Sequence, residues 1–199
     1  MDKSYWDQYY QKNSKPFNPS DFANFVVKKV EKNSSIIDIG CGNGRDSIYL
    51  SKSNLKTLGV DQSKIVINNL KQFESNYLSF ECSDIKELRK VKFDNAYCRF
   101  LFHSISEDEE DSLLLWLKNY ISNKIFIEAR IDLDIDQYIK TDHYRRLMNI
   151  QEFKLKLQSL GLEIEFEKIS DKFSIYKKNY NVGDIKFNPQ LIRLIIKNK

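Results

Sequence analysis

The chain has 199 residues, of which 41% are hydrophobic and 30% charged, which is enough for one well-buried core and too little for two ordinary domains. Lys and Arg are scattered among acids and leave a formal net charge of only +4, which argues against a protein that coats nucleic acid. The acidic and aromatic start of the chain, the lack of about 18 consecutive uncharged apolar residues, and three cysteines without CxxC spacing predict a soluble, cytoplasmic protein with no transmembrane segment and no metal site. We therefore expect a single domain over 1–199.

The first half of the chain alternates between strand and helix patterns. The aromatic and polar residues 4–10 precede Pro16 and Pro19, and we interpret 1–19 as a short lid-like segment. Ser20 then caps a helix predicted over 21–31. Short β-branched runs predict buried strands over 35–39, 56–60, 77–81, 93–98 and 124–129. Helical spacing predicts helices over 45–53, 64–73 and 106–120, the last with a capping box.

The second half is less regular. A polar excursion over 131–149 precedes a helix at 150–160 that Gly161 ends, and an alternating strand follows at 162–169. A last strand is predicted over 191–196, although 173–176 competes for that place. Strands and helices in alternation imply an α/β fold with a mostly parallel sheet and helices on both faces.

A glycine-rich loop between the first strand and its helix carries the clearest functional signal. Glycines stand at positions 40, 42 and 44, so that backbone without side chains can approach a ligand closely. The following helix offers unpaired N–H groups and a positive dipole end, which suit a carboxylate or a phosphate. Arg45 stands where the dinucleotide fingerprint needs glycine, and the Gly-Lys-Ser/Thr ending of a P-loop is absent. A plain strand-to-helix turn is the alternative explanation.

The run from Asp38 to Asp46 resembles motif I of class I S-adenosylmethionine (SAM)-dependent methyltransferases, and acids follow the next two strands at Asp61 and Asp84. The resemblance implies a Rossmann-like, seven-stranded fold with SAM as cofactor and S-adenosylhomocysteine (SAH) as its product. Asp61 would bind the ribose, Asp84 the adenine amine, and Asp38 a water or the amino group of the methionine part, with Arg45 on the cofactor carboxylate. Either acid alone is as well explained by a helix cap. The full predicted cofactor set is Asp38, Gly40, Gly42, Gly44, Arg45, Asp61, Gln62, Asp84, Ile85 and Tyr9.

The end of the fourth strand is where open α/β sheets place a reactive site. His103 follows this strand, and we predict it to be catalytic as a general base, with a structural histidine as the alternative. Arg99, also predicted as catalytic, and Arg130 suggest recognition of an anionic acceptor. Arg145 and Arg146 extend this cluster unless they are solvated or pair with nearby aspartates. The predicted acceptor set is Arg99, Arg130, His143, Tyr144, Arg145, Arg146, Tyr5 and Tyr10.

Three further segments, 5–10, 19–23 and 188–193, resemble methyltransferases found with bacterial surface-polysaccharide genes, including a domain that methylates a terminal phosphate. In that group the N-terminal aromatics fold over the cofactor, and an aromatic staple is the alternative. This chain departs from the group at Ala129 and Ile131, where Phe and Thr are expected. The resemblance implies an O-methyltransferase for a phosphorylated sugar, a polyol or another small glycan precursor, associated with other glycan-synthesis enzymes. A small-metabolite N-methyltransferase and a non-catalytic SAM-binding subunit remain alternatives, whereas a nucleic-acid substrate is disfavoured.

Overall fold

A computed structural model describes residues 3–12, 15–16, 18–131, 148–173 and 190–198. A seven-stranded sheet with the order β3-β2-β1-β4-β5-β7-β6 forms its centre. The strands are β1 (Ser35–Ile39), β2 (Lys56–Asp61), β3 (Leu78–Cys82), β4 (Phe93–Arg99), β5 (Ile121–Arg130), β6 (Leu162–Ser170) and β7 (Leu191–Asn198). The first five strands run parallel, and β7 is antiparallel to both β5 and β6. The predicted fold class, a mostly parallel Rossmann-like sheet, is confirmed.

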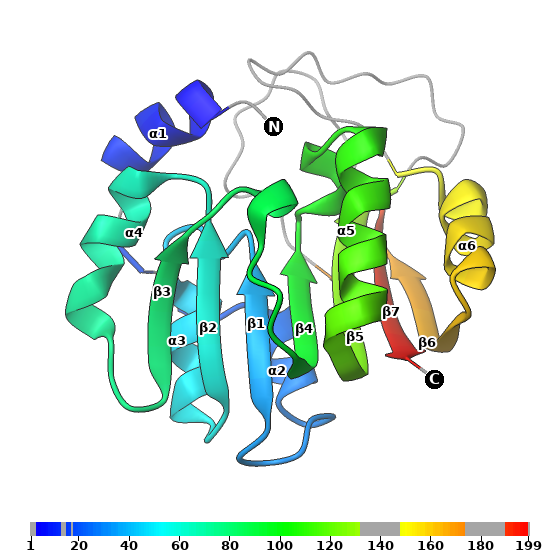
Figure 1. The fold of residues 1–199 in the computed structure, drawn as a ribbon, viewed down its shortest axis with the longest axis horizontal. Coiled ribbons are helices and arrows are strands. Elements are labelled where there is room, and N and C mark those ends of the chain that lie inside the picture. The colour runs from blue at the N-terminus through cyan, green and yellow to red at the C-terminus, as the bar shows by residue number, and fades with distance from the viewer. Residues whose placement is uncertain (1–2, 13–14, 17, 132–147, 174–189, 199) are drawn as a thin grey trace.

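Helices cover both faces of the sheet (Figure 1). They are α1 (Lys3–Lys12), α2 (Asp21–Val26), α3 (Arg45–Lys52), α4 (Lys64–Leu70), α5 (Glu107–Tyr120) and α6 (Ile150–Ser159), with short 3-10 turns η1 (Lys71–Phe73), η2 (Ile85–Glu87) and η3 (Phe102–Ser104). In Figure 1, α5 crosses the near face, α2 and α3 lie behind the sheet, and α1 lies above α4 beside β3. In the part of the chain that the structure describes, no helix is long and apolar enough to span a membrane.

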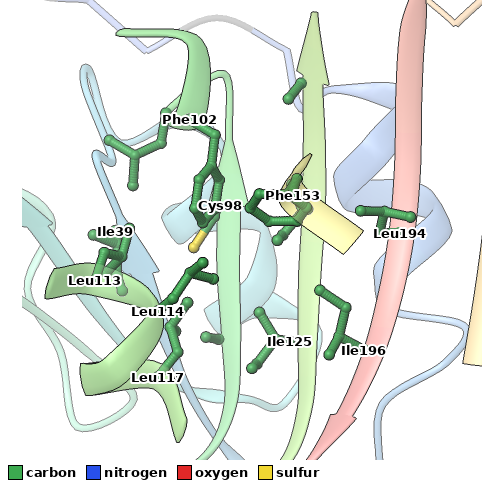
Figure 2. Packing of buried hydrophobic residues seen from close by; sticks show 14 of the residues in the cluster. Ile39, Cys98, Phe102, Leu113, Leu114, Leu117, Ile125, Phe153, Leu194 and Ile196 are labelled. Carbon is green, nitrogen blue, oxygen red and sulfur yellow. The ribbon is translucent and has the colours of Figure 1, made fainter. Parts of the chain in front are cut away.

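The strands are apolar on both faces because each face meets a helix layer. Ile37 and Ile39 of β1 belong to the core cluster under α5 and α6, whereas Ile36 packs with Phe22 of α2 and Phe126 of β5 on the opposite face. Figure 2 shows Leu113 of α5 beside Ile39 of β1, Leu114 and Leu117 of α5 next to β4, and Phe153 of α6 next to β5. Such continuous apolar runs are typical of buried parallel strands, which explains why the strands could be read from the sequence.

The structure corrects several boundaries. Residues 3–12 form the helix α1, which the lid-like interpretation did not specify, and α2 ends at Val26 instead of continuing to residue 31. The β-branched residues Val26, Val27 and Val30 disfavour its continuation. The helix predicted over 64–73 ends at Leu70 and continues as the 3-10 turn η1. Residues 174–189, and with them most of the competing 173–176 strand, lie outside the described ranges.

The N-terminus of α5 has the predicted capping box. Ser106 Oγ accepts a hydrogen bond from the Glu109 N–H, and Glu109 Oε2 accepts one from the Ser106 N–H. We expect Ser106→Ala to lower the free energy of unfolding by about 1 kcal/mol, because the partly buried Glu109 N–H in the first turn loses its partner. Urea unfolding of wild type and variant measures this. Ser112→Ala, in the middle of the same helix, is the control and should change it by less than about 0.5 kcal/mol.

Candidate functional site

The glycine loop lies at the carboxyl ends of β1 and β2 and starts α3. Gly40 and Gly44 have φ angles of 75° and 73°, in the left-handed region where a side chain is strained. A Cβ at residue 44 would also lie 2.6 Å from Leu70 Cδ2 of α4. Glycine is therefore required at position 44, because a side chain there would be strained and would come too close to Leu70. The Gly40 and Cys41 N–H groups both donate to the Val60 carbonyl oxygen, and the Gly44 N–H donates to that of Cys41, so backbone hydrogen bonds hold the loop at the end of β2.

Asp61, at the end of β2, binds this loop through a hydrogen bond. Its Oδ2 accepts a hydrogen bond from the Gly42 N–H at 3.0 Å, and its Oδ1 accepts one from the Ser63 N–H at 2.9 Å. Burial raises the pKa of the Asp61 carboxyl, and these two N–H donors act in the opposite direction. The side chain predicted for the ribose thus also holds the loop that precedes it.

A pocket opens beside Asp61. Its lining residues are Ile39, Gly40, Val60, Asp61, Gln62, Ser83, Asp84, Ile85, Leu88, Leu101 and Glu109. Apolar walls with a few acceptors suit the flat faces and polar edges of an adenosine group. Gln62 Nε2 is buried and has no hydrogen-bond partner among the described residues, so a ligand acceptor would satisfy it. The pocket therefore fits the adenosine part of SAM, and Asp61, Gln62, Asp84 and Ile85 meet there.

Asp84 also has a structural role as a helix cap. Its Oδ1 accepts a hydrogen bond from the Lys86 N–H at 2.9 Å and so caps η2. This is the helix-cap explanation that the sequence left open, and it coexists with a place in the pocket wall. Glu109 also lines the pocket while it completes the capping box of α5. The sequence showed that capping box, but gave no sign that α5 starts at the pocket.

Asp38 lies behind the loop with only 2% of its surface exposed. Ser47 Oγ of α3 donates a hydrogen bond to Asp38 Oδ2 at 2.6 Å. Burial raises the pKa of Asp38 to about 8; the Ser47 bond lowers it, and the charges of Asp46 and Asp61 raise it further. In the cofactor-free protein the Asp38 carboxyl therefore carries a proton over much of the neutral pH range.

Helix α1 covers the glycine loop. The hydroxyl of Tyr10 lies against Gly42, and Ser63 Oγ donates a hydrogen bond to Asp7 of α1. Asn43 of the loop donates to the Lys15 carbonyl oxygen at 3.0 Å. Tyr5 and Tyr9 lie in an aromatic cluster with Trp6 on the same helix. Tyr10, which the sequence assigned to the acceptor, is therefore the tyrosine that lies against the glycine loop, whereas Tyr9, assigned to the cofactor, is 38% exposed.

We expect Tyr10→Ala to weaken SAH binding about tenfold, because the loop loses the side chain that packs on it and excludes water. Calorimetric titration measures the change. Tyr9→Ala removes a tyrosine from the same helix at a more exposed position and should leave the affinity within about twofold. Equal effects of the two substitutions would contradict a specific contact of Tyr10 with the site.

Charged side chains gather at the ends of β4 and β5. Arg99 Nε donates to Glu128 Oε1 at 2.9 Å, and Arg193 Nε of β7 donates to Glu128 Oε2 at 2.7 Å. Glu128 is 1% exposed, so one buried carboxylate holds two guanidinium groups. The Arg99 charge also acts on Asp38, where it lowers the pKa against the effect of burial. The Arg99 side chain thus lies between the glycine loop and the end of β5.

His103 and Arg130 lie next to this pair. The Arg99 guanidinium is 4.0 Å and that of Arg130 5.8 Å from the centre of the Phe100 ring, and the His103 ring is 5.4 Å from it. The Arg130 backbone N–H donates a hydrogen bond to His103 Nδ1 at 3.3 Å. The structure therefore brings together Arg99, His103 and Arg130 from the predicted set. His143, Tyr144, Arg145 and Arg146 lie outside the described residues.

Sequence reasoning missed two buried networks. Asp46 accepts hydrogen bonds from the Ser20 N–H and Oγ at 2.8 Å each and from Tyr97 Oη at 2.7 Å, which ties α3 to α2 and β4. Arg193 is the other omission, although a lone charge inside the apolar run of β7 signals a buried partner. Arg45, predicted for the cofactor carboxylate, has its Nε 3.5 Å from Asp46. That Nε is buried and makes no hydrogen bond among the described residues.

Known proteins resemble this chain in sequence and fold. Residues 36–121 match a family described as a methyltransferase domain. Putative methyltransferase 235L of Invertebrate iridescent virus 6 is 27% identical over 222 residues, which cover 96% of this chain and 79% of the viral protein. The fold is similar to that of a TehB-like SAM-dependent methyltransferase from Corynebacterium glutamicum, with a TM-score of 0.69, 18% identity and 98% of each chain covered. It is also similar to magnesium protoporphyrin IX methyltransferase from Synechocystis with bound SAH, with a TM-score of 0.68, 16% identity, and 90% of this chain and 80% of that chain covered.

The family match covers all the residues that line the pocket, from Ile39 to Glu109, and also the strand that carries Arg99. Over residues 36–121 this chain is therefore similar to methyltransferase domains, and its fold is similar to that of SAM-dependent methyltransferases.

Proposed function

We propose that this methyltransferase transfers the methyl group of SAM to an oxygen of a small anionic acceptor, such as a phosphorylated sugar or polyol or a terminal phosphate, in surface-glycan biosynthesis. One observation carries the proposal: the buried Arg130 and Arg193 and the partly buried Arg99 gather around Phe100 and Glu128 where β4 and β5 end. Guanidinium groups bind phosphate and carboxylate in a two-pronged geometry, and in a buried site they favour an anion over a neutral molecule.

The chain's own residues supply binding, alignment and exclusion of water. When bound, SAM supplies a sulfonium-linked methyl group as the electrophile. Asp61, Gln62 and Asp84 would hold its adenosine end, and Asp38 and the glycine loop its methionine end. The Arg99 charge acts on Asp38 and its Nε pairs with Glu128, so this guanidinium would hold an acceptor anion beside the cofactor. Alignment of this kind contributes up to about 7–11 kcal/mol in favourable cases, so the site needs little other chemistry.

The test is SAH formation with glucose 1-phosphate and glycerol 3-phosphate, compared with glucose and glycerol. We expect turnover with the phosphorylated compounds only. Arg130→Gln should raise the KM for them about tenfold to a hundredfold, as expected for loss of a charge-assisted contact. Arg89→Gln removes an arginine whose side chain is 49% exposed, and it should leave the KM unchanged. Equal turnover of the neutral compounds, or turnover of amines alone, would contradict the proposal.

A further inference from the structure

We propose that the pocket beside Asp61 takes free adenine nucleosides, such as adenosine and 5′-methylthioadenosine, while α1 stays docked, whereas SAM and SAH enter only after α1 has left the glycine loop. This inference rests on the assignment of the pocket to SAM in the proposed function, and it is independent of the acceptor. It adds a second class of ligand to the pocket and makes α1 a gate for the amino-acid end of the cofactor.

The pocket holds the groups that a nucleoside needs. Its lining residues lie between Ile39 and Glu109, so none of these residues belongs to α1. The carboxyl oxygens of Asp61 and Asp84 accept hydrogen bonds, and Gln62 Nε2 is a buried donor without a partner among the described residues. Adenine and ribose together offer hydroxyl and amino donors and ring-nitrogen acceptors. An adenine nucleoside therefore satisfies these groups without an amino-acid tail.

The space beside Gly42 is already filled by Tyr10 of α1. A Cβ at residue 42 would lie 2.4 Å from Tyr10 Oη and 3.3 Å from its Cζ, so the phenol fills the room that glycine leaves. Burial raises the pKa of Tyr10, and the charges of Asp61 and Asp38 add to this effect, so the phenol lies near both carboxyl groups. The proposed function places the methionine end of SAM at Asp38 and the glycine loop. A ligand with an amino-acid tail therefore meets Tyr10, whereas a nucleoside in the pocket does not.

Helix α1 is held in this position by buried contacts with α4. The Ser63 hydroxyl, at the N-terminus of α4, donates a hydrogen bond to Asp7 of α1, and Ser63 is 0% exposed. The Ser63 N–H donates to Asp61 Oδ1, so one residue joins α1 to the pocket wall. The Tyr10 ring packs on apolar side chains of α4, above which α1 lies in Figure 1. Because α1 has to lose these contacts before it leaves, the open state is a minor one.

The two classes of ligand should then differ in how they bind. A ligand that binds only the open state cannot enter faster than α1 opens, so its observed binding rate levels off as its concentration rises. A nucleoside that binds while α1 stays docked has no such limit. Binding kinetics therefore separate the two modes of entry, even where the final affinities are similar.

The first arm of the test follows α1 itself. The chain has only two tryptophans, Trp6 in α1 and Trp116 in α5, so Trp116→Phe leaves one fluorescent reporter on α1. Trp116 Nε1 makes no hydrogen bond among the described residues, so Phe removes none. Calorimetry should show that this variant binds both SAH and 5′-methylthioadenosine. In stopped-flow mixing, SAH should change the Trp6 emission at a rate that levels off with SAH concentration, and the nucleoside should leave this emission unchanged.

Two results of this arm would overturn the gate. One is a Trp6 signal with the nucleoside that equals the signal with SAH. The other is an SAH rate that rises in proportion to concentration up to saturation. Binding of SAH without binding of the nucleoside would contradict this inference alone, whereas failure to bind either ligand would contradict the cofactor assignment on which it rests.

The second arm loosens α1 and keeps both tryptophans. We expect Asp7→Ala to raise the limiting rate of SAH binding about tenfold, the scale of one hydrogen bond to a charged group. The affinity for 5′-methylthioadenosine should stay within about twofold, because the pocket lining is unchanged. Gln11→Ala, at an exposed position of the same helix, is the matched control and should change neither quantity. An Asp7→Ala variant with the limiting rate of Gln11→Ala would show that α1 does not control entry.

Discussion

Asp61→Ala is expected to weaken SAH binding by about a hundredfold or more. The carboxylate lines the cofactor pocket and also accepts the Gly42 and Ser63 N–H groups. The substitution therefore removes a ligand contact, frees the glycine loop and leaves two backbone donors without their partner, and each hydrogen bond to a charged group contributes about 1.5–3 kcal/mol. Calorimetric titration of SAH into wild type and variant measures the loss.

Asp94→Ala is the matched control because it removes a similar carboxylate at the other end of the sheet. Asp94 Oδ2 accepts hydrogen bonds from the Ser35 N–H at 2.7 Å and from Ser35 Oγ at 2.8 Å, where β1 begins. Its loss should lower the free energy of unfolding without changing SAH affinity. If Asp61→Ala bound SAH as tightly as Asp94→Ala does, the assignment of the pocket to the cofactor would be wrong.

Most of the sheet and the cofactor loop could be predicted because their signals are local. Short β-branched runs mark strands that are buried on both faces, and alternate glycines mark a loop that has no room for side chains. Ser106 and Glu109 fixed the start of α5 through hydrogen bonds three residues apart. Each of these features depends on neighbours within a few positions in the chain.

The rest of the site depends on contacts between distant segments, which a single sequence does not contain. The partners Arg193 and Glu128 lie 65 positions apart and meet only because β7 inserts beside β5 in the antiparallel direction. Tyr10 and Tyr9 are indistinguishable in the sequence, and the docking of α1 on α4 decides which of them contacts Gly42. The helical nature of α1 was hidden because its aromatic residues are packed mainly on one another.

Asp38→Asn is expected to stabilise the cofactor-free protein at alkaline pH. Burial raises the folded-state pKa of Asp38 to about 8, well above the value of about 3.9 in an unfolded chain. The folded state thus binds this proton more tightly, so the contribution to stability is full below about pH 4 and is lost as pH rises through 8. Asn cannot ionise, and the variant should be more stable than wild type at pH 8 by on the order of 5 kcal/mol. Thermal unfolding at pH 4 and pH 8 measures this, and the two proteins should differ little at pH 4.

The same carboxyl should couple cofactor binding to proton release. If the methionine end of SAM places its ammonium group near Asp38, the added positive charge favours the ionised carboxylate, and the buried proton leaves. SAH affinity should then rise with pH up to about 8 and level off above it, with close to one proton released at pH 7. Calorimetry in phosphate and Tris buffers, whose ionisation enthalpies differ, counts that proton. Asp38→Asn should release none and bind more weakly, whereas Asp94→Ala should behave as wild type. Binding by wild type without proton release would place the ammonium group away from Asp38 and leave this residue with a purely structural bond to Ser47.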